Sequence, residues 1–243
     1  MTRIILTALV TGANKGIGFE TARQLARRGF RVWLGCRDEE RGVAAAADLA
    51  TDGDVRFVRL DVTDIGSVRA AAERIERETS SLDVLVNNAG VAGGEGDGFP
   101  STTPLEAVQR TFEVNFYGAL RVTQAFLPLL QKSNAGRIVN VASIWGSLTS
   151  LVAPESFLLS FPAFAYASSK TALNALTGWL AVELKDTPIK INSVCPGYTA
   201  TDINHNTGTQ HPAEAAKIVV RAATLEANGP TGTFFDANGA LGW

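Results

Sequence analysis

The stretch TGANKGIG, residues 11–18, lies between a short apolar run and a longer amphipathic run. Gly12 permits a tight turn, Gly16 lets the backbone approach a pyrophosphate, and Gly18 lets a helix pack closely on a strand. The free N–H groups and the helix dipole at such a turn favour a bound dianion. A glycine pattern alone is a weak signal, and a purely structural turn is the alternative. Because this one joins an expected strand to an expected helix, it predicts a nucleotide-binding loop.

The alternation of short apolar and longer amphipathic runs continues along the whole chain. It predicts strands over residues 4–10, 31–36, 55–60, 82–86, 136–142, 189–194 and 232–235. It predicts helices over residues 16–28, 64–79, 103–130 (ending near Pro128), 166–185 and 212–227, and an alanine-rich helix that ends near residue 50. Strands without alternation of inward and outward residues indicate a parallel sheet covered on both faces. The expected fold is therefore α/β, a doubly wound parallel sheet of the Rossmann type.

The bulk properties fit one soluble enzyme-sized domain. The chain has 243 residues, of which 46% are hydrophobic, and no linker divides it, so we expect a single dinucleotide-binding and catalytic domain over residues 1–243. A net charge of −2 gives no electrostatic case for nucleic acid or for an anionic membrane. The first apolar run is too short to span a bilayer and leads straight into the glycine turn, which indicates a strand rather than a signal segment. Cys36 and Cys195 are far apart, and two reduced thiols fit a cytoplasmic location.

The end of the second expected strand bears on the choice between NAD and NADP. NAD sites usually carry an acidic residue there, whereas NADP sites place a cation near the 2′-phosphate. In this chain Cys36 takes the acidic position and Arg37 follows it, while Lys15 lies within the glycine loop. An arginine fork and a lysine charge suit a phosphate dianion, so the sequence favours NADP(H). The alternative is that Arg37 is a solvated residue paired with Asp38 or Glu39.

Tyr166 and Lys170 stand four residues apart in AYASSK, residues 165–170, with only small residues between them. On a helix they share a face one turn apart. A lysine charge about 5 Å from the phenol, at an effective dielectric constant of about 20, favours the phenolate by roughly 3 kcal/mol. That is about two units below the usual tyrosine pKa of about 10, which suits acid–base catalysis near neutral pH. An exposed aromatic and an exposed cation at a helix start are the alternative.

These stretches belong to a longer series of motifs. The series is TGANKGIG at residues 11–18, LDVTD at 60–64, NNAG at 87–90, EVNFYG around Asn115, VNVAS at 139–143, YASSK at 166–170 and CPGYTATD at 195–202. In this order and spacing the chain resembles the short-chain dehydrogenase/reductase family over essentially its whole length. Within the family it is most similar to NADPH-dependent carbonyl reductases, on TGANKGIG, GCRDEERG, CPGYTATDI and the ending GTFFDANGALGW.

The resemblance implies a role for specific residues. It implies a catalytic set of Asn115, Ser143, Tyr166 and Lys170, in which Asn115 supports the others through a water. It implies cofactor contacts by Gly12, Asn14, Lys15, Gly16, Ile17, Gly18, Arg37, Asp61, Val62, Asn88, Ala89, Gly90, Tyr166, Lys170, Pro196, Gly197 and Thr201. Asp61 and Val62 would contact the adenine, and the segment from Pro196 to Thr201 would hold the nicotinamide end. Ser143 would stabilise charge on the carbonyl oxygen, and Lys170 would also bind the nicotinamide ribose.

Two features depart from the family pattern or leave alternatives open. The residue before Ser143 is often a second serine in the family and is Ala142 here. The connection at residues 147–164 is long and apolar, with Phe157, Phe161 and Phe164 among its side chains. It suits an apolar pocket wall, a subunit contact or a loop without function. Carbonyl reductases carry a longer insertion here that is associated with a monomer, so the chain is either a monomer or a small homo-oligomer.

His205 and His211 do not have the spacing of metal ligands, and no third ligand accompanies them, so we expect no metal site. They suit a polar loop that covers the substrate.

The expected activity is NADPH-dependent reduction of a small-molecule ketone or aldehyde. A second enzymatic interpretation is reduction of a β-ketoacyl thioester, which activity on an acyl carrier thioester would reveal. A non-enzymatic interpretation is a redox sensor that binds NADP(H) and a partner protein without turnover. The intact set of Ser143, Tyr166 and Lys170 argues against the sensor, which has no need of a positioned proton donor.

Overall fold

The computed structural model describes residues 5–243. Its seven strands are all parallel and follow the order β3-β2-β1-β4-β5-β6-β7. The strands are β1 (Thr7–Thr11), β2 (Arg31–Cys36), β3 (Val55–Arg59), β4 (Val84–Asn87), β5 (Arg137–Val141), β6 (Lys190–Val194) and β7 (Thr233–Phe235). The order reverses between β1 and β4, which is where ligands bind in such sheets. The doubly wound fold expected from the sequence is confirmed.

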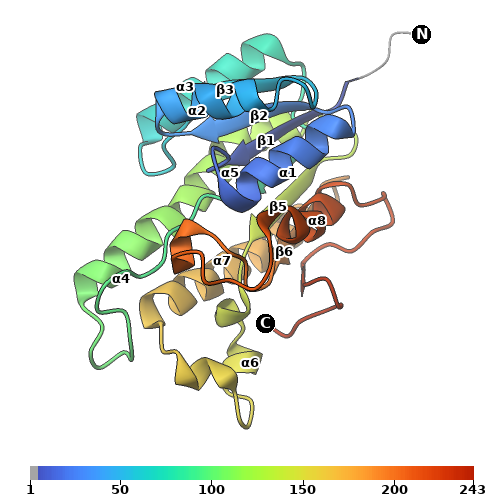
Figure 1. The fold of residues 1–243 in the computed structure, drawn as a ribbon. Coiled ribbons are helices and arrows are strands. Elements are labelled where there is room, and N and C mark those ends of the chain that lie inside the picture. Colours follow the sequence, from blue (N-terminus) through green and yellow to red (C-terminus); the bar gives the residue numbers. More distant parts are fainter. Residues whose placement is uncertain (1–4) are drawn as a thin grey trace.

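Helices cover both faces of this sheet (Figure 1). They are α1 (Gly16–Arg27), α2 (Glu39–Asp48), α3 (Ile65–Glu78), α4 (Leu105–Phe112), α5 (Ala119–Leu130), α6 (Leu148–Leu151), α7 (Phe164–Glu183) and α8 (Pro212–Ala223). One buried cluster joins α1, α2 and α8 to the sheet, and a second joins α3, α5 and α7 to its other face. Leu9 and Val10, adjacent in β1, enter opposite clusters. This two-sided burial explains the continuous apolar strands.

Several element boundaries differ from those expected. The strand predicted over residues 4–10 is observed as β1, and Ile4 lies outside the described residues. The helix predicted over residues 103–130 is observed as α4, a π-helical turn η1 (Glu113–Gly118) and α5. Pro128 lies within α5, which continues to Leu130. A proline removes one helical hydrogen bond, but here it stands in the last turn, where the helix ends soon afterwards.

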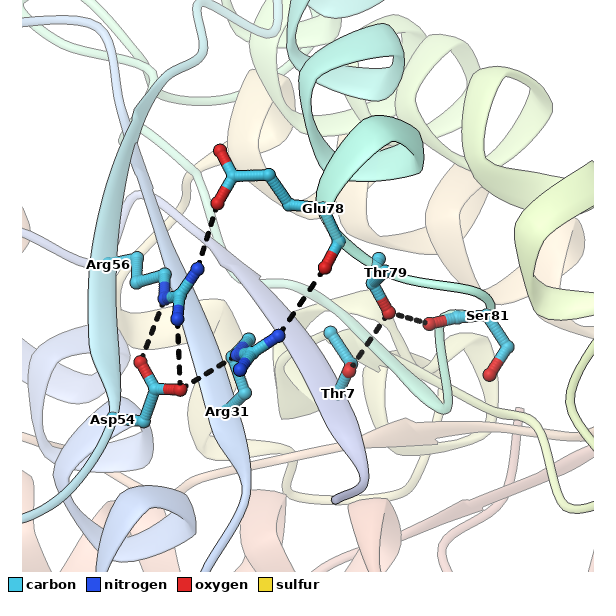
Figure 2. Close-up of polar contacts among 7 residues, drawn as sticks. All are labelled: Thr7, Arg31, Asp54, Arg56, Glu78, Thr79 and Ser81. Atoms are coloured by element: carbon cyan, nitrogen blue, oxygen red, sulfur yellow. Dashed lines mark hydrogen bonds and ion pairs between the residues drawn. The ribbon is translucent and has the colours of Figure 1, made fainter. Parts of the chain in front are cut away.

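The amino-terminal edge of the sheet carries a cluster of ion pairs (Figure 2). Arg31 and Arg56 both bind Asp54, with N–O distances of 2.7 and 2.8 Å, and Arg56 also binds Glu78 at the end of α3 at 2.8 Å. The guanidinium groups of Arg56 and Arg74 lie over the buried Trp33 ring, at 5.9 and 5.5 Å from its centre. These contacts fasten α3 to β2 and β3 at the edge opposite the glycine loop.

The long connection at residues 147–164 contains α6 and a 3₁₀ turn, η3 (Phe157–Ser160). Figure 1 shows this segment, drawn in yellow, extending from the same end of the molecule as the start of α4 and the orange segment near residue 200. Val152 and Phe161 are strongly exposed there, at 79% and 66%. Within residues 5–243, every helix is too short or too polar to cross a membrane.

Candidate active site

The glycine loop leads from β1 into α1 and packs closely against the end of β4. Gly12 has a φ of +62°, and a Cβ there would lie 2.8 Å from Cα of Ala89. Gly16, the first residue of α1, has a φ of +59°. Lys15 precedes it without a capping side chain, so the first N–H groups of the helix remain available. This cradle fits a phosphate at a helix N-terminus, as the sequence predicted.

The end of β4 is tied to this loop. The amide of Asn88 donates to the carbonyl oxygen of Thr11 at 2.8 Å, and the Thr11 hydroxyl accepts from the N–H of Ala89 at 3.0 Å. A Cβ on Gly18 would collide with the Asn88 amide. The Asn88 side chain therefore holds the glycine loop in its conformation. The sequence motif did not reveal this contact.

The ends of β2 and β3 form the expected adenosine side. Cys36 is buried, and Arg37 is exposed beside it. Asp38 pairs with Arg41 at 3.5 Å rather than with Arg37 in the described part of the chain. Burial opposes ionisation of Asp61, but hydrogen bonds from Thr63 and the charges of Arg37 and Arg59 outweigh it and lower its pKa. The aspartate is thus ionised and held in one orientation.

A cavity of about 550 Å³ adjoins the glycine loop and is lined by two basic side chains, Lys15 and Arg41, and by two acidic ones, Asp48 and Asp202. The Lys15 ammonium pairs with Asp202, which lies in the 3₁₀ turn η4 (Asp202–Asn204). Both side chains are more than half exposed, at 56% and 62%, so solvent screens this pair. Arg41 was missed in the sequence, although its position one turn after Arg37 at the start of α2 was a usable signal.

Ser143, Tyr166 and Lys170 meet at the carboxyl end of β5. Ser143 follows this strand, and Tyr166 and Lys170 lie one turn apart on α7. The Lys170 ammonium is 5.7 Å from the centre of the Tyr166 ring and donates to the Val141 carbonyl oxygen at 2.8 Å. Lys170 is only 5% exposed. The side chains that the sequence grouped are therefore neighbours in space.

The expectation of a lowered pKa for Tyr166 is wrong for this structure. Loss of water around the hydroxyl raises the pKa of Tyr166 to about 12, although Ser143 is close enough to oppose part of that rise. Burial also lowers the pKa of Lys170 to about 8. The shift expected from the sequence included only the attraction between the Lys170 cation and the phenolate. It left out the free-energy cost of removing water from both groups, which is the larger effect here.

Asn115 lies in the π-helical turn η1 and is 1% exposed. Its side-chain oxygen Oδ1 accepts from the Val91 N–H at 2.8 Å. Its side-chain nitrogen Nδ2 donates to the Val91 carbonyl oxygen at 2.9 Å and to the Ser169 hydroxyl at 2.9 Å. The inserted turn brings this side chain between the end of β4 and α7. π-Helical turns often accompany functional sites.

The turn that carries Ser143 packs directly on α7. A Cβ on Gly146 would lie 2.8 Å from the backbone carbon of Lys170, so only glycine permits this approach. Asn174, one turn after Lys170, donates to the Gly146 carbonyl oxygen at 3.1 Å. On the other side, the Ser147 hydroxyl donates to the carbonyl oxygen of Gly242 at 2.7 Å. Asn174 was also missed in the sequence, because nothing local marks it as a partner of this turn.

The segment after β6 crosses the same end of the molecule. Gly197 has a φ of +84°, and Thr201 faces the glycine loop, since its methyl group lies 3.5 Å from a Cβ built on Gly16. His211 caps α8 through its Nδ1, which accepts from the Ala213 N–H at 3.2 Å. No cluster of three or more metal-ligating side chains occurs within residues 5–243.

Comparison with known proteins agrees with this geometry. A family model described as short chain dehydrogenase matches residues 6–212. The (−)-isopiperitenone reductase of Mentha piperita is 38% identical over 313 aligned positions that cover 99% of each chain. The (+)-neomenthol dehydrogenase of Capsicum annuum is 36% identical, over 94% of each chain. The crystal structure of NADPH-bound carbonyl reductase from chicken fatty liver superposes with a TM-score of 0.86 at 27% identity, over 99% of this chain and 100% of that one.

The aligned length of 313 positions exceeds the 243 residues of this chain, so the mint relative carries insertions that are absent here. The match nevertheless extends over nearly all of both chains. The chain is an enzyme of the oxidoreductase kind and belongs to the short-chain dehydrogenase/reductase family.

Proposed function

We propose that this enzyme reduces the carbonyl group of a small ketone or aldehyde to an alcohol, with NADPH as the hydride donor. The observation that carries the proposal is the convergence of Ser143, Tyr166 and Lys170 at the carboxyl end of β5, at the same edge of the sheet as the glycine loop. The structural likeness to the NADPH-bound carbonyl reductase from chicken fatty liver supports it.

The mechanism follows from the protonation states in the site. A Tyr166 pKa of about 12 keeps the phenol protonated at neutral pH, so it donates its proton to the carbonyl oxygen of the substrate. The Ser143 hydroxyl donates a hydrogen bond to the same oxygen and stabilises the charge that develops there. The nicotinamide supplies the hydride when the cofactor is bound. Lys170 is mainly protonated below its pKa of about 8, and its charge favours the phenolate that remains on Tyr166.

The cofactor proposal rests on the basic groups at the end of β2. Arg37 is exposed, and Arg41 and Lys15 line the adjoining cavity together with two carboxylates, Asp48 and Asp202. The guanidinium groups of Arg37 and Arg41 suit the additional phosphate of NADP. The remaining contacts are proposed as the family resemblance implies. They are Gly12, Asn14, Gly16, Ile17, Gly18, Asp61, Val62, Asn88, Ala89, Gly90, Tyr166, Lys170, Pro196, Gly197 and Thr201. Asn115 supports the catalytic side chains from η1.

The deciding experiment measures initial rates of cofactor oxidation with aryl ketones, aldehydes and a β-ketoacyl thioester, each with NADPH and with NADH. Turnover of simple carbonyl compounds with a preference for NADPH is the expected result. Turnover of the thioester alone would instead assign the enzyme to acyl chain synthesis. The variant Tyr166→Phe should lose turnover and keep its dinucleotide affinity, and retained turnover would contradict the mechanism.

A further inference from the structure

Helix α7 carries the proposed proton donor, and its first turn does not have a cap of its own. The helix begins at Phe164, and the residue before it, Ala163, has no side chain that accepts a hydrogen bond. The first N–H groups of any helix need acceptors from elsewhere when they are removed from water. The position of Tyr166, in this first turn, therefore depends on whatever supplies those acceptors.

The acceptors come from the glycine-rich loop after β4, far away in sequence. One carboxylate oxygen of Asp97 accepts from the Ala165 N–H at 2.8 Å, and the other accepts from the Tyr166 N–H at 3.2 Å. The carbonyl oxygen of the next residue, Gly98, accepts from the Phe164 N–H at 2.9 Å. Consecutive N–H groups at the start of α7 are thus all bound by two adjacent loop residues. A carboxylate also suits the positive end of the helix dipole.

The loop is shaped to deliver this carboxylate. Gly94 and Gly96 have φ values of +80° and +81°, which side chains rarely allow, and the Asp97 N–H closes the turn onto the Gly94 carbonyl oxygen at 3.2 Å. The Asp97 carboxylate rests against the backbone of Gly93, where any Cβ would collide with it. The glycines of this loop therefore place the Asp97 carboxylate at the start of α7.

We propose that Asp97 is a positioning residue of the active site, which caps α7 from another part of the chain and thereby fixes the backbone of Tyr166. This inference rests on the proposed function, because it assigns Asp97 a role through the phenol of Tyr166. Asp97 makes no contact with the reacting groups themselves. It acts on the angle and depth at which the phenol enters the site, and a displacement of about 1 Å is enough to reduce a rate by about 100-fold.

The test compares Asp97→Ala and Asp97→Asn with Asp64→Ala. Asp64 caps α3 through an equivalent hydrogen bond to the Gly66 N–H at 2.8 Å, so it is a matched control for the loss of a helix cap. Asp97→Ala should lower kcat between about 10-fold and about 100-fold and leave the KM for the dinucleotide unchanged. Asp97→Asn should recover part of the loss, because asparagine is also a good cap. Asp64→Ala should lower the melting temperature with kcat unchanged.

A second variant, Gly93→Ala, keeps Asp97 but displaces its carboxylate from the position in which it caps α7, because the added Cβ would collide with it. It should also lower kcat, as Asp97→Ala does. The inference can therefore still be tested if Asp97→Ala folds poorly. Equal kcat values for wild type, Asp97→Ala and Gly93→Ala, alongside an inactive Tyr166→Phe, would overturn the inference and leave the proposed function intact. Retained turnover in Tyr166→Phe would instead overturn the proposed function.

Discussion

At the scale of single residues, the pair Tyr166 and Lys170 shows what sequence reasoning captures and what it omits. The spacing of four residues was enough to predict that the two side chains share a face. It was not enough to give the sign of the Tyr166 pKa shift, because burial depends on the residues that cover the site from other elements. Lys170 is enclosed by β5 and α7 together, and removal of water dominates the electrostatics of both groups.

The pKa values predict how the rate depends on pH. Tyr166 stays protonated up to about 12, so it does not limit the reduction reaction in mild base. Lys170 loses its proton as the pH rises through about 8, and its charge then no longer favours the phenolate. We expect kcat/KM for reduction to fall as the pH rises above this value. Lys170→Met should be slow at every pH and should lack that decline, whereas a decline that persists unchanged would assign it to another group.

Asn174 offers a second prediction at this scale. It is 3% exposed, and its amide is the donor to the Gly146 carbonyl oxygen in the turn that carries Ser143. Asn174→Ala should destabilise the fold by about 1–3 kcal/mol, because a buried acceptor loses its partner. It should also lower kcat through Ser143. Asn192→Ala removes a buried amide that binds the Pro230 carbonyl oxygen, the Thr233 N–H and the Thr233 hydroxyl, so it should cost at least as much stability with kcat unchanged. Equal kcat effects in both variants would deny Asn174 a specific role.

At the scale of helices and strands, the sequence predicted which elements exist better than where they end. Strand β2 and the start of α8 match their predicted residues, because buried runs and a proline at the first helical turn are local signals. The π-helical turn at Asn115 was not predicted, since its extra residue is held by contacts with Val91 and Ser169 from other elements. The start of α7 at Phe164 was also missed, because its cap is supplied by Asp97.

The ion pairs at the amino-terminal edge of the sheet predict that the stability of the fold decreases slightly in acid. Burial opposes ionisation of Asp54, but the hydrogen bonds and charges of Arg56 and Arg31 outweigh it and lower its pKa below the ordinary 3.8. A carboxyl whose pKa is lowered by folding stabilises the protein fully at pH values above its pKa in the unfolded chain. This stabilisation is lost as the pH falls through its pKa in the folded protein. Because these side chains are partly exposed, the contribution is about 0.5–1 kcal/mol.

Urea unfolding of wild type and Asp54→Asn measures this contribution. At pH 7 the variant should be less stable by about that amount, and the stabilities of the two proteins should converge as the pH falls through the lowered pKa of Asp54. If the stability difference between wild type and Asp54→Asn stays constant down to the lowest pH, the substitution destabilises the fold through packing and not through charge.

At the scale of the whole molecule, the fold brings together segments that no local pattern connects. Parallel order places the glycine loop, Ser143 and the ends of β2 and β3 at one edge, and this much could be predicted from the alternation of strands and helices. The contacts that close the site were not predictable in this way. Lys15 pairs with Asp202, 187 residues away, and the Ser147 hydroxyl binds the carbonyl oxygen of Gly242, 95 residues away. Such pairings depend on loop paths, which the motifs do not specify.

Cofactor choice is also a property of the whole molecule, because a ligand that binds only the folded chain raises its melting temperature. At a concentration of 100 times Kd, a dinucleotide adds about 2.7 kcal/mol of stability. For a chain of this length that corresponds to a rise of roughly 5–10 °C. We expect NADPH to produce the larger rise at equal concentrations with NADH, and Arg37→Ala to remove the difference while the rise with NADH remains. Arg28→Ala changes an exposed arginine at the far end of α1 and should leave both rises unchanged. A larger rise in melting temperature with NADH would contradict the cofactor proposal. If Arg37→Ala still prefers NADPH, the phosphate contact would be assigned to Arg41 or Lys15 instead of Arg37.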